Sequence, residues 1–192
     1  MSGYTLTQPE LFYSLPAVVT KNTYTTQAPI SAVASTSIPR CVIPALYFSQ
    51  VGKSVHFEAN GTIGSAAGTA TFIFAGGLDA AAGTIAGTGG GTMFTTNTLT
   101  PTTTTVPWTM TVDLVCQAVG NLGTTIQVSG EVDVHGGATS TWSTSRSATM
   151  FSNSMTGMNN EISLYLELFG TWSVSNVGNT TTLQQLKVYL EN

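Results

Sequence analysis

The residues of this chain with the clearest chemical potential are two histidines that each stand two positions from a carboxylate. His56 and Glu58 lie in one segment, and Asp133 and His135 lie in another. Two imidazoles and two carboxylates form a ligand set that a divalent metal such as Zn²⁺ accepts. In both segments, however, these residues alternate with apolar neighbours and therefore belong to the polar side of a strand. We expect solvated positions on a sheet, with no bound metal or cofactor.

Nucleophilic or hydrolytic catalysis finds little support in the sequence. Neither a Gly-x-Ser-x-Gly turn nor a pairing of cysteine with histidine is visible. The nine acidic residues are spread over the chain, whereas glycosidases need a close pair of carboxyl groups. The glycine-rich run 87–92 lacks the Lys-Ser/Thr ending of a phosphate-binding loop and is interpreted as a flexible turn. We expect that the protein is not an enzyme.

A hydrophobic period of two dominates the chain and indicates β-strands. In residues 54–63, Val55, Phe57 and Ile63 share one face, while His56 and Glu58 share the other. The same alternation runs through 108–118, 125–134, 162–174 and 182–190, and weaker strands are expected at 30–34, 70–75 and 84–94. No segment shows the period of 3.6 residues, with caps, that a helix requires. The pattern predicts an all-β fold of antiparallel strands, arranged as a two-sheet sandwich or a closed barrel.

The length of 192 residues fits one domain. We divide the chain into an extended N-terminal arm, residues 1–27, and a β-sandwich domain, residues 28–192. The arm lacks a regular period but carries bulky side chains, namely Tyr4, Leu11, Phe12, Tyr13 and Tyr24. Because such side chains would stay exposed in a free tail, we expect the arm to dock on a neighbouring molecule.

Two further segments, 83–105 and 136–160, are predicted to be surface loops because they are rich in glycine and small polar residues. Trp142 lies in the second segment between hydroxyl residues. It is equally compatible with a contact to a sugar or protein partner and with a simple loop anchor. Trp108 and Trp172 lie on apolar stripes and are expected in the core.

Charge is scarce in this chain: 7% of the residues are charged, and the formal net charge is -4. Five dispersed Lys and Arg residues cannot neutralise a run of phosphates, which excludes nucleic acid as a partner. The same scarcity argues against anionic membrane surfaces. The polar surface must instead come from the 34 threonines and 18 serines. Such a surface gains little solubility from charge repulsion, so we expect much of it to lie against a partner.

The two cysteines, Cys41 and Cys116, stand among apolar residues and are expected to be buried free thiols rather than a disulfide. No apolar run approaches 18 residues, so no transmembrane helix is expected. The first residues show no basic stretch followed by an apolar one, so a signal peptide is not expected either.

Three stretches together form a recognisable pattern. In the first, Ile43-Pro44-Ala45 leads into the turn Val51-Gly52-Lys53 and a strand; in the second, a strand from Trp108 ends near Cys116 and Val119-Gly120. The third is the Leu/Gln-rich ending from Leu183 to Asn192. The order and spacing of these stretches, over about residues 38–192, resemble a group of virion proteins of tailed bacteriophages, especially phages of actinobacteria.

The resemblance implies a jelly-roll-like β-sandwich that forms a homotrimer on the virion surface. The chain would be a capsid decoration (cement) or minor capsid protein that binds the major capsid protein, made in the cytoplasm of the bacterial host. In that setting we expect Leu11, Phe12 and Tyr13 of the arm to contact adjacent capsid subunits. Tyr165 and Phe169, the bulky residues on the polar face of the 162–174 strand, are predicted to form the trimer interface.

The alternative is a head- or tail-fibre module that binds a receptor on the host surface. Trp142 in its hydroxyl-rich loop and the glycine-rich segment 83–92 favour this second function.

Overall fold

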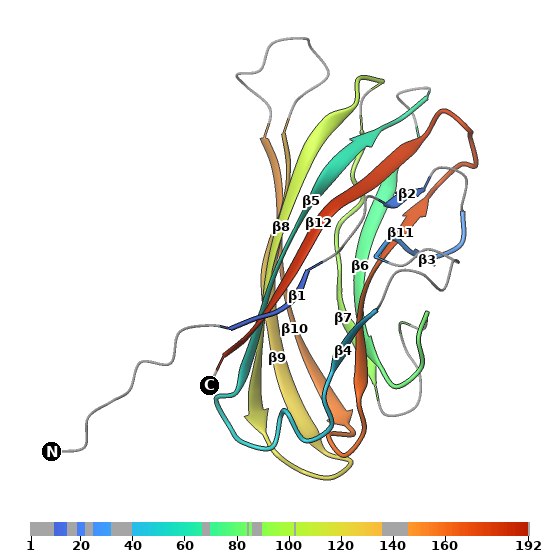
Figure 1. Ribbon diagram of the computed structural model, residues 1–192. Helices are drawn as coiled ribbons and strands as arrows, with labels where there is room; N and C mark the ends of the chain where they lie inside the picture. The colour runs from blue at the N-terminus through green and yellow to red at the C-terminus, as the bar shows by residue number, and fades with distance from the viewer. Residues whose placement is uncertain are drawn as a thin grey trace, which may run out of the picture.

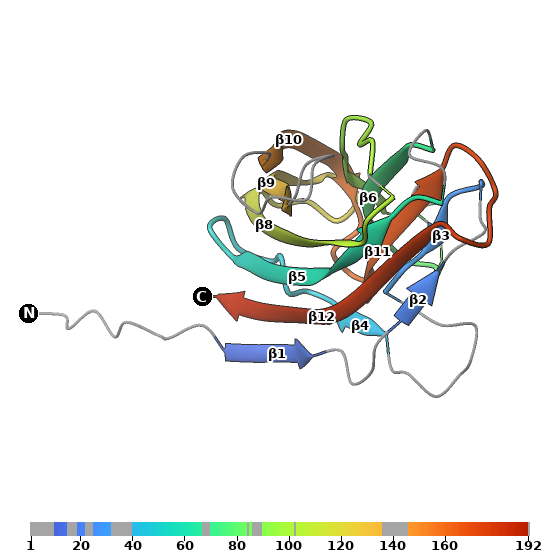
Figure 2. The same cartoon turned by 90° about the horizontal axis from the view of Figure 1, so that it is seen from above.

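The fold is a sandwich of two antiparallel β-sheets, as the alternating pattern predicted (Figure 1). The computed structural model describes residues 10–14, 19–21, 25–31, 40–66, 70–83, 85, 90–101, 103–135 and 146–191. These residues form twelve strands and no helix. The view from above shows the two layers, with the C-terminal strand β12 running along one side (Figure 2).

The larger sheet has the strand order β1-β12-β5-β8-β9-β10, with β2 also paired to β12. Its members are β1 (Glu10–Ser14), β2 (Val19–Lys21), β5 (Ser54–Gly64), β8 (Val106–Ala118), β9 (Thr124–His135), β10 (Arg146–Met158) and β12 (Thr180–Glu191). The smaller sheet has the order β3-β11-β6-β7, with β4 also paired to β11. Its members are β3 (Ala28–Pro29), β4 (Cys41–Ile43), β6 (Phe72–Asp79), β7 (Gly91–Thr95) and β11 (Leu164–Trp172). β5 pairs with β12 and β6 with β11, whereas β8, β9 and β10 form a meander.

The core lies between the sheets and is built from the apolar stripes of the strands. Trp108 of β8 and Trp172 of β11 are both 0% exposed, as predicted. Phe72 contacts Trp172 with ring centroids 4.8 Å apart, and Phe74 contacts Trp108 at 4.7 Å. Both phenylalanines come from β6, so this strand joins the two tryptophans into one aromatic cluster. Each buried side chain of this size contributes about 1.5–3 kcal/mol before ordering costs.

Strand β10 corrects the prediction of a surface loop over residues 136–160. Residues 146–158 pair with β9 through almost their whole length. The segment is polar and lacks a clear apolar period, so the alternation pattern does not predict a strand there. Its inner face is instead held by Phe151, which stacks on Phe94 of β7 at 4.1 Å. Gly130 on β9 makes room for this ring, because a Cβ there would lie 2.9 Å from Phe151.

The expected arm is also partly incorporated into the sheet of its own chain. Residues 10–14 and 19–21 form β1 and β2, which pair antiparallel with β12. The physical reason is that the edge of β12 offers unpaired backbone N–H and C=O groups, which an extended segment satisfies. Within β1, Leu11 is 52% exposed and Tyr13 is half-buried against the core. Burial raises the pKa of Tyr13 to about 12, with smaller contributions from Cys41 and Glu167.

Cys41 and Cys116 are buried free thiols, as the sequence predicted. Burial raises the pKa of Cys41 to about 12 and also raises the pKa of Cys116. Because the thiolate is the reactive form, both thiols are expected to resist Ellman's reagent at pH 8 in the native protein. Two equivalents should react after unfolding in guanidinium chloride. A rapid reaction of either thiol in the absence of denaturant would contradict this prediction.

Candidate functional site

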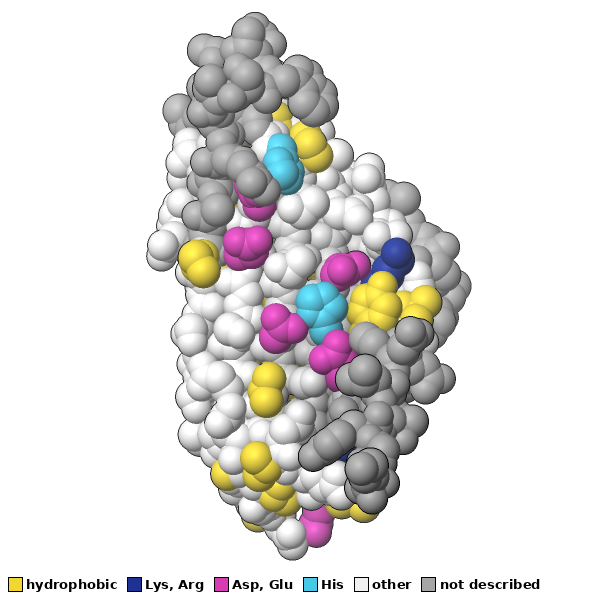
Figure 3. Space-filling model, turned by 90° about the vertical axis from the view of Figure 1, so that its left-hand side faces the viewer, with side chains coloured by type: hydrophobic (Ala, Val, Ile, Leu, Met, Phe, Trp, Pro, Cys, Tyr) yellow, Lys and Arg dark blue, Asp and Glu magenta, His cyan; other side chains and the backbone are white. Residues whose placement is uncertain are grey.

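The outer face of the larger sheet gathers most of the titratable side chains that the sequence singled out. The strand register places Tyr189 of β12, His56 of β5 and Asp113 of β8 in one row across the sheet. A second row contains Lys187, Glu58, Thr111 and Glu131. Figure 3 shows both histidines on this face, with acidic side chains beside them and a mostly uncharged polar surface around.

His56 is the centre of the first row. Its Nδ1 lies 2.7 Å from Oδ1 of Asp113, and its Nε2 lies 3.6 Å from Oε1 of Glu58. The ring of Tyr189 stands beside the imidazole at a centroid distance of 5.9 Å. One carboxylate belongs to the neighbouring strand β8 and the other stands two residues along β5, so negative charge lies on two sides of the imidazole.

The pKa of His56 lies above its ordinary value of 6.5. Partial burial lowers this pKa, but the hydrogen bond and charge of Asp113, together with those of Glu58, outweigh that effect and raise it. The charge of His56 is therefore expected to change at a higher pH than that of an ordinary histidine.

We predict that His56 makes the folding stability of the protein pH-dependent. A raised folded-state pKa means that protonated His56 stabilises the fold fully below about pH 6.5, and that this contribution disappears as the pH rises through the folded-state pKa. Urea unfolding of wild type and His56→Gln should differ at pH 6 by up to about 1 kcal/mol and by less at pH 8.5. The same comparison in an Asp113→Asn background should show a smaller pH effect. An equal difference at both pH values would contradict the prediction.

The two histidine–carboxylate pairs do not converge on one metal site. His56 and Glu58 are on β5, and Asp133 and His135 are on β9, with β8 between them. Neighbouring strands are about 4.8 Å apart, so β5 and β9 are roughly 10 Å apart. The register adds a further displacement along the strands, because Glu58 is level with Glu131, whereas Asp133 and His135 lie two and four residues beyond Glu131. Within the described residues no group of three or more His, Cys, Asp or Glu side chains is arranged to hold a metal ion. The exposed-sheet interpretation of His56 and Glu58 agrees with this placement.

The second pair differs from the first in burial. Asp133 is only 4% exposed, and its Oδ2 lies 3.8 Å from Nε2 of His135. The sequence pattern placed Asp133 on the polar face but gave no sign that it would be covered. The same imidazole nitrogen lies 3.3 Å from Oγ1 of Thr109, so His135 is held between β8 and β9.

The rest of this face is held by cross-strand contacts between uncharged polar groups. Thr62 and Thr182 face each other with their hydroxyl oxygens 2.6 Å apart. The amide of Asn60 donates to Gln185 at 3.2 Å, and the amide of Gln127 donates to Ser152 at 3.0 Å. A shallow groove between the rows is lined by Asp113, Ser129, Glu131, Met150 and Ser152, among others. The result is a broad polar surface whose charged side chains, mostly acidic, lie near its centre.

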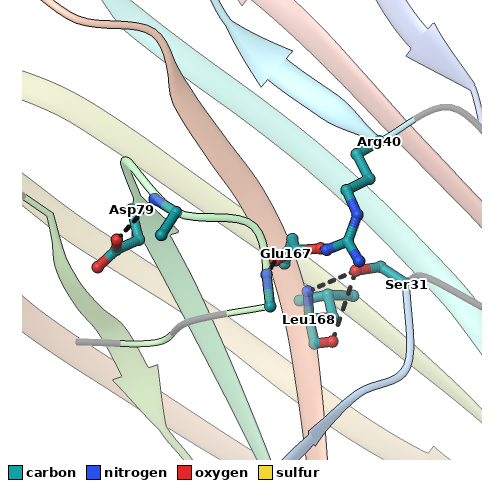
Figure 4. A network of polar contacts seen from close by, with 7 residues as sticks. Ser31, Arg40, Asp79, Glu167 and Leu168 are labelled. Atoms are coloured by element: carbon teal, nitrogen blue, oxygen red, sulfur yellow. Dashed lines mark hydrogen bonds and ion pairs between the residues drawn. The ribbon is translucent and has the colours of Figure 1, made fainter. Parts of the chain in front are cut away.

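The outer face of the smaller sheet is covered by other parts of the chain. Glu167 of β11, which is 2% exposed, forms an ion pair with Arg40, and its second oxygen accepts a hydrogen bond from the backbone N–H of Gly83 (Figure 4). On the next residue, the N–H of Leu168 donates to Oγ of Ser31 at 2.9 Å. These contacts fasten three separate segments of the chain across β11.

This cover buries Phe169, which the sequence placed at a trimer interface. Phe169 is 1% exposed within its own chain, although it lies on the outer face of β11. A Cβ on Gly77 would lie 3.0 Å from both the Phe169 ring and the backbone of Ile85, so the connection after β6 passes over this ring. The alternation in the sequence identified the face correctly but could not show that a distant segment would cover it. Tyr165 is half-buried on the same strand, opposite Asp79 and Val42.

The other predicted contact residues have different outcomes. Leu11 and Tyr13 lie on β1 as described above, and Phe12 lies between them on the same strand. Tyr4 and Trp142 lie outside the described residues. No helix in the described part of the chain is long and apolar enough to cross a membrane.

Sequence reasoning missed a group of exposed aliphatic residues in the turns at one end of the sandwich. Leu46 and Val51 lie in the connection from β4 to β5, and Val119 and Leu122 lie in the β8–β9 hairpin. They are 57%, 67%, 46% and 71% exposed, in that order. The signal was present in the sequence as large apolar residues inside turn segments, where polar residues are usual.

No family model, curated protein or solved structure matches the chain.

Proposed function

We propose that this chain is a bacteriophage virion structural protein, a homotrimeric capsid decoration (cement) or minor capsid protein that binds and stabilises the major capsid shell. The observation that carries the proposal is the number of large apolar side chains at the surface. Among the described residues these are Leu11, Leu46, Val51, Val119, Leu122, Met150, Val174 and Val177. A chain with 7% charged residues has little charge repulsion to keep such a surface apart from its neighbours. Burial between neighbours in a particle removes the apolar side chains from water.

The proposed mechanism is mechanical. Two packed sheets form a rigid body, and its exposed turns and polar outer face provide many small contacts. Each large side chain buried in such a contact contributes about 1.5–3 kcal/mol before ordering costs. In a trimer the second and third contacts form intramolecularly, which strengthens attachment without any new contact type. The resemblance to phage virion proteins supplies the identity of the neighbour, the capsid shell.

The proposal is tested with DNA-free phage heads that lack the protein. Purified protein should sediment with these heads at hundreds of copies per particle and should raise the temperature at which the shells break. A protein that stays in the supernatant at concentrations well above its expected occupancy would reject the proposal. Its copy number in purified virions is an independent check, because a tail component would be present in only a few copies.

The trimer is tested separately by light scattering. Tyr165 remains a candidate interface residue because it is partly exposed on β11. Tyr165→Glu is expected to produce monomers with unchanged circular dichroism. A trimer that survives this change excludes the Tyr165 face, and Phe169 is no longer a useful test because its substitution would disturb the fold.

A fibre or receptor-binding module is the second candidate. The groove on the larger sheet favours it, since carboxylates of Asp113 and Glu131 lie beside the exposed side chain of Met150, 81% exposed. Carboxylates that accept hydroxyl hydrogen bonds next to an apolar surface suit a sugar. Binding of purified protein to host cell-wall glycans, with no binding to heads, would favour this function over decoration.

A further inference from the structure

Leu46 has a backbone conformation that its side chain disfavours. Its φ is 62°, the one positive value among the described residues other than glycine. In this left-handed region the Cβ of an ordinary residue approaches the following carbonyl oxygen, so glycine, asparagine and aspartate are the usual occupants. The side chain of Leu46 is 57% exposed, so its burial within the described fold offsets little of the free-energy cost of this backbone conformation.

The surrounding contacts force this conformation on Leu46. Its N–H donates to the carbonyl of Asn160 at 2.6 Å, and its own carbonyl accepts from the N–H of Ser49 at 3.2 Å. The next residue, Tyr47, is anchored by its hydroxyl group, which lies 2.6 Å from the carbonyl oxygen of Ser54 and accepts from the N–H of Glu191 at 3.0 Å. The turn is therefore fixed from several sides, and the strain is kept at a position that points an aliphatic group outward.

Leu46 belongs to a group of four exposed aliphatic residues, which we name the apolar tip: Leu46, Val51, Val119 and Leu122. The two turns that carry them are joined, because the N–H of Gly52 donates to the carbonyl of Cys116 at 2.9 Å. Figure 1 shows the β4–β5 connection and the β8–β9 hairpin closing the same, lower end of the sandwich. Figure 3 shows hydrophobic side chains gathered at that end, below the acidic centre of the face, with an acidic side chain at their lower border.

The charge and size of the apolar tip restrict what can cover it. The two turns themselves, residues 44–52 and 118–123, contain no charged side chain, although the exposed Glu161 follows Asn160, whose carbonyl accepts from Leu46. A strongly charged partner surface would therefore lose hydration and gain few ion pairs. The nearest cation in sequence, Lys53, has its ammonium group over the Tyr47 ring, 5.6 Å from the centroid. Four aliphatic side chains offer roughly a few hundred Å². A stable pairwise interface needs about 800 Å² from each partner, so this surface is too small to hold a dimer.

We propose that the apolar tip docks on an uncharged apolar surface of a repeated protein lattice, where many small contacts act together. The inference depends on the proposed function for one point, namely that the lattice is the capsid shell. It assigns the contact to the end of the sandwich formed by the β4–β5 and β8–β9 turns, and it explains why a strained leucine occupies a position suited to glycine.

The test uses Leu46→Gly, which separates folding from binding. Glycine accepts a φ of 62° without strain, so the urea midpoint of the variant should equal or exceed that of wild type. Its affinity for empty heads, measured by sedimentation, should fall at least tenfold. Leu122→Ser should weaken binding in the same way. The matched control is Val177→Ser, which changes an aliphatic residue that is 81% exposed and lies between β11 and β12, outside the apolar tip. This variant should bind like wild type.

The outcomes distinguish this inference from the proposed function. If wild type binds heads and Leu46→Gly binds equally well, the apolar tip is not the docking surface, although the proposed function stands. If wild type does not bind heads, the proposed function itself fails. The inference is also overturned if Leu46→Gly changes the molecular mass in light scattering, which assigns the tip to self-association. Loss of binding to uncharged phosphatidylcholine vesicles in this variant would assign the tip to lipid instead.

Discussion

Replacing Arg40 with methionine is expected to lower the free energy of unfolding by about 3 kcal/mol. The substitution leaves the carboxylate of Glu167 buried, at 2% exposure, with the N–H of Gly83 as its remaining described partner. An uncompensated buried charge costs far more than the attraction of an ordinary surface pair, because water no longer solvates it. Urea unfolding followed by tryptophan fluorescence measures the loss.

The double variant Arg40→Met with Glu167→Gln provides the control. Removal of both charges should recover a large part of the lost stability, because an amide can keep the hydrogen bond from Gly83 without a buried charge. If Arg40→Met left the free energy of unfolding unchanged, the ion pair would not be what holds the segment around Arg40 across β11. Lys187→Met, a change of one cation on the outer face of β12, should alter stability by less than about 0.5 kcal/mol.

Gly61→Ala is expected to destabilise the fold by about 3 kcal/mol or more, because it inserts a methyl group where two strands meet closely. A Cβ on Gly61 would lie 1.8 Å from the carbonyl oxygen of Thr182 and 3.0 Å from the indole of Trp108. One of these neighbours is backbone, so relief requires β5 and β12 to move apart. The measurement is again the urea midpoint, with circular dichroism to detect a change in strand content.

The close approach has a visible cause in the register. The pairing of β12 with β5 shifts between Leu183 and Gln185, next to the position where Gly61 faces Leu183. A bulge of this kind bends the strand and brings backbone against backbone. The matched control is Gly123→Ala in the β8–β9 hairpin, where a Cβ has no neighbour within 4 Å. Equal stability losses at the two positions would show that loss of glycine as such, rather than the contact with Thr182, is responsible.

The comparison of Gly61 with Gly123 also shows what kind of information a sequence lacks. Alternation assigns Gly61 to the inward face of its strand, together with Phe57 and Ile63, and the structure agrees with that face. Nothing local distinguishes a glycine that must stay glycine from one that fills a turn. The difference depends on Thr182, which is more than a hundred residues away in the chain.

In the candidate site, too, some features follow from the local sequence pattern and others depend on the sheet register. The positions of His56 and Glu58 on an exposed strand face follow from period-two alternation, because successive side chains of a strand point to opposite sides. The partner that sets the pKa of His56 is Asp113 on β8, and only the sheet register brings it to 2.7 Å. The separation of the two histidine pairs by a whole strand is likewise a property of strand order.

The sequence by itself determined the class of this fold. Strong alternation in five segments, together with two tryptophans on the apolar faces of those segments, was enough to predict antiparallel sheets and a shared core. Tertiary structure alone decided that β10 joins a sheet, that Phe169 is covered, that residues 10–14 pair with β12, and that Leu46 is exposed under strain. The reason is physical. Alternation reports which side of a strand is apolar, whereas covering, pairing and strain depend on contacts between residues far apart in the chain, which no local pattern encodes.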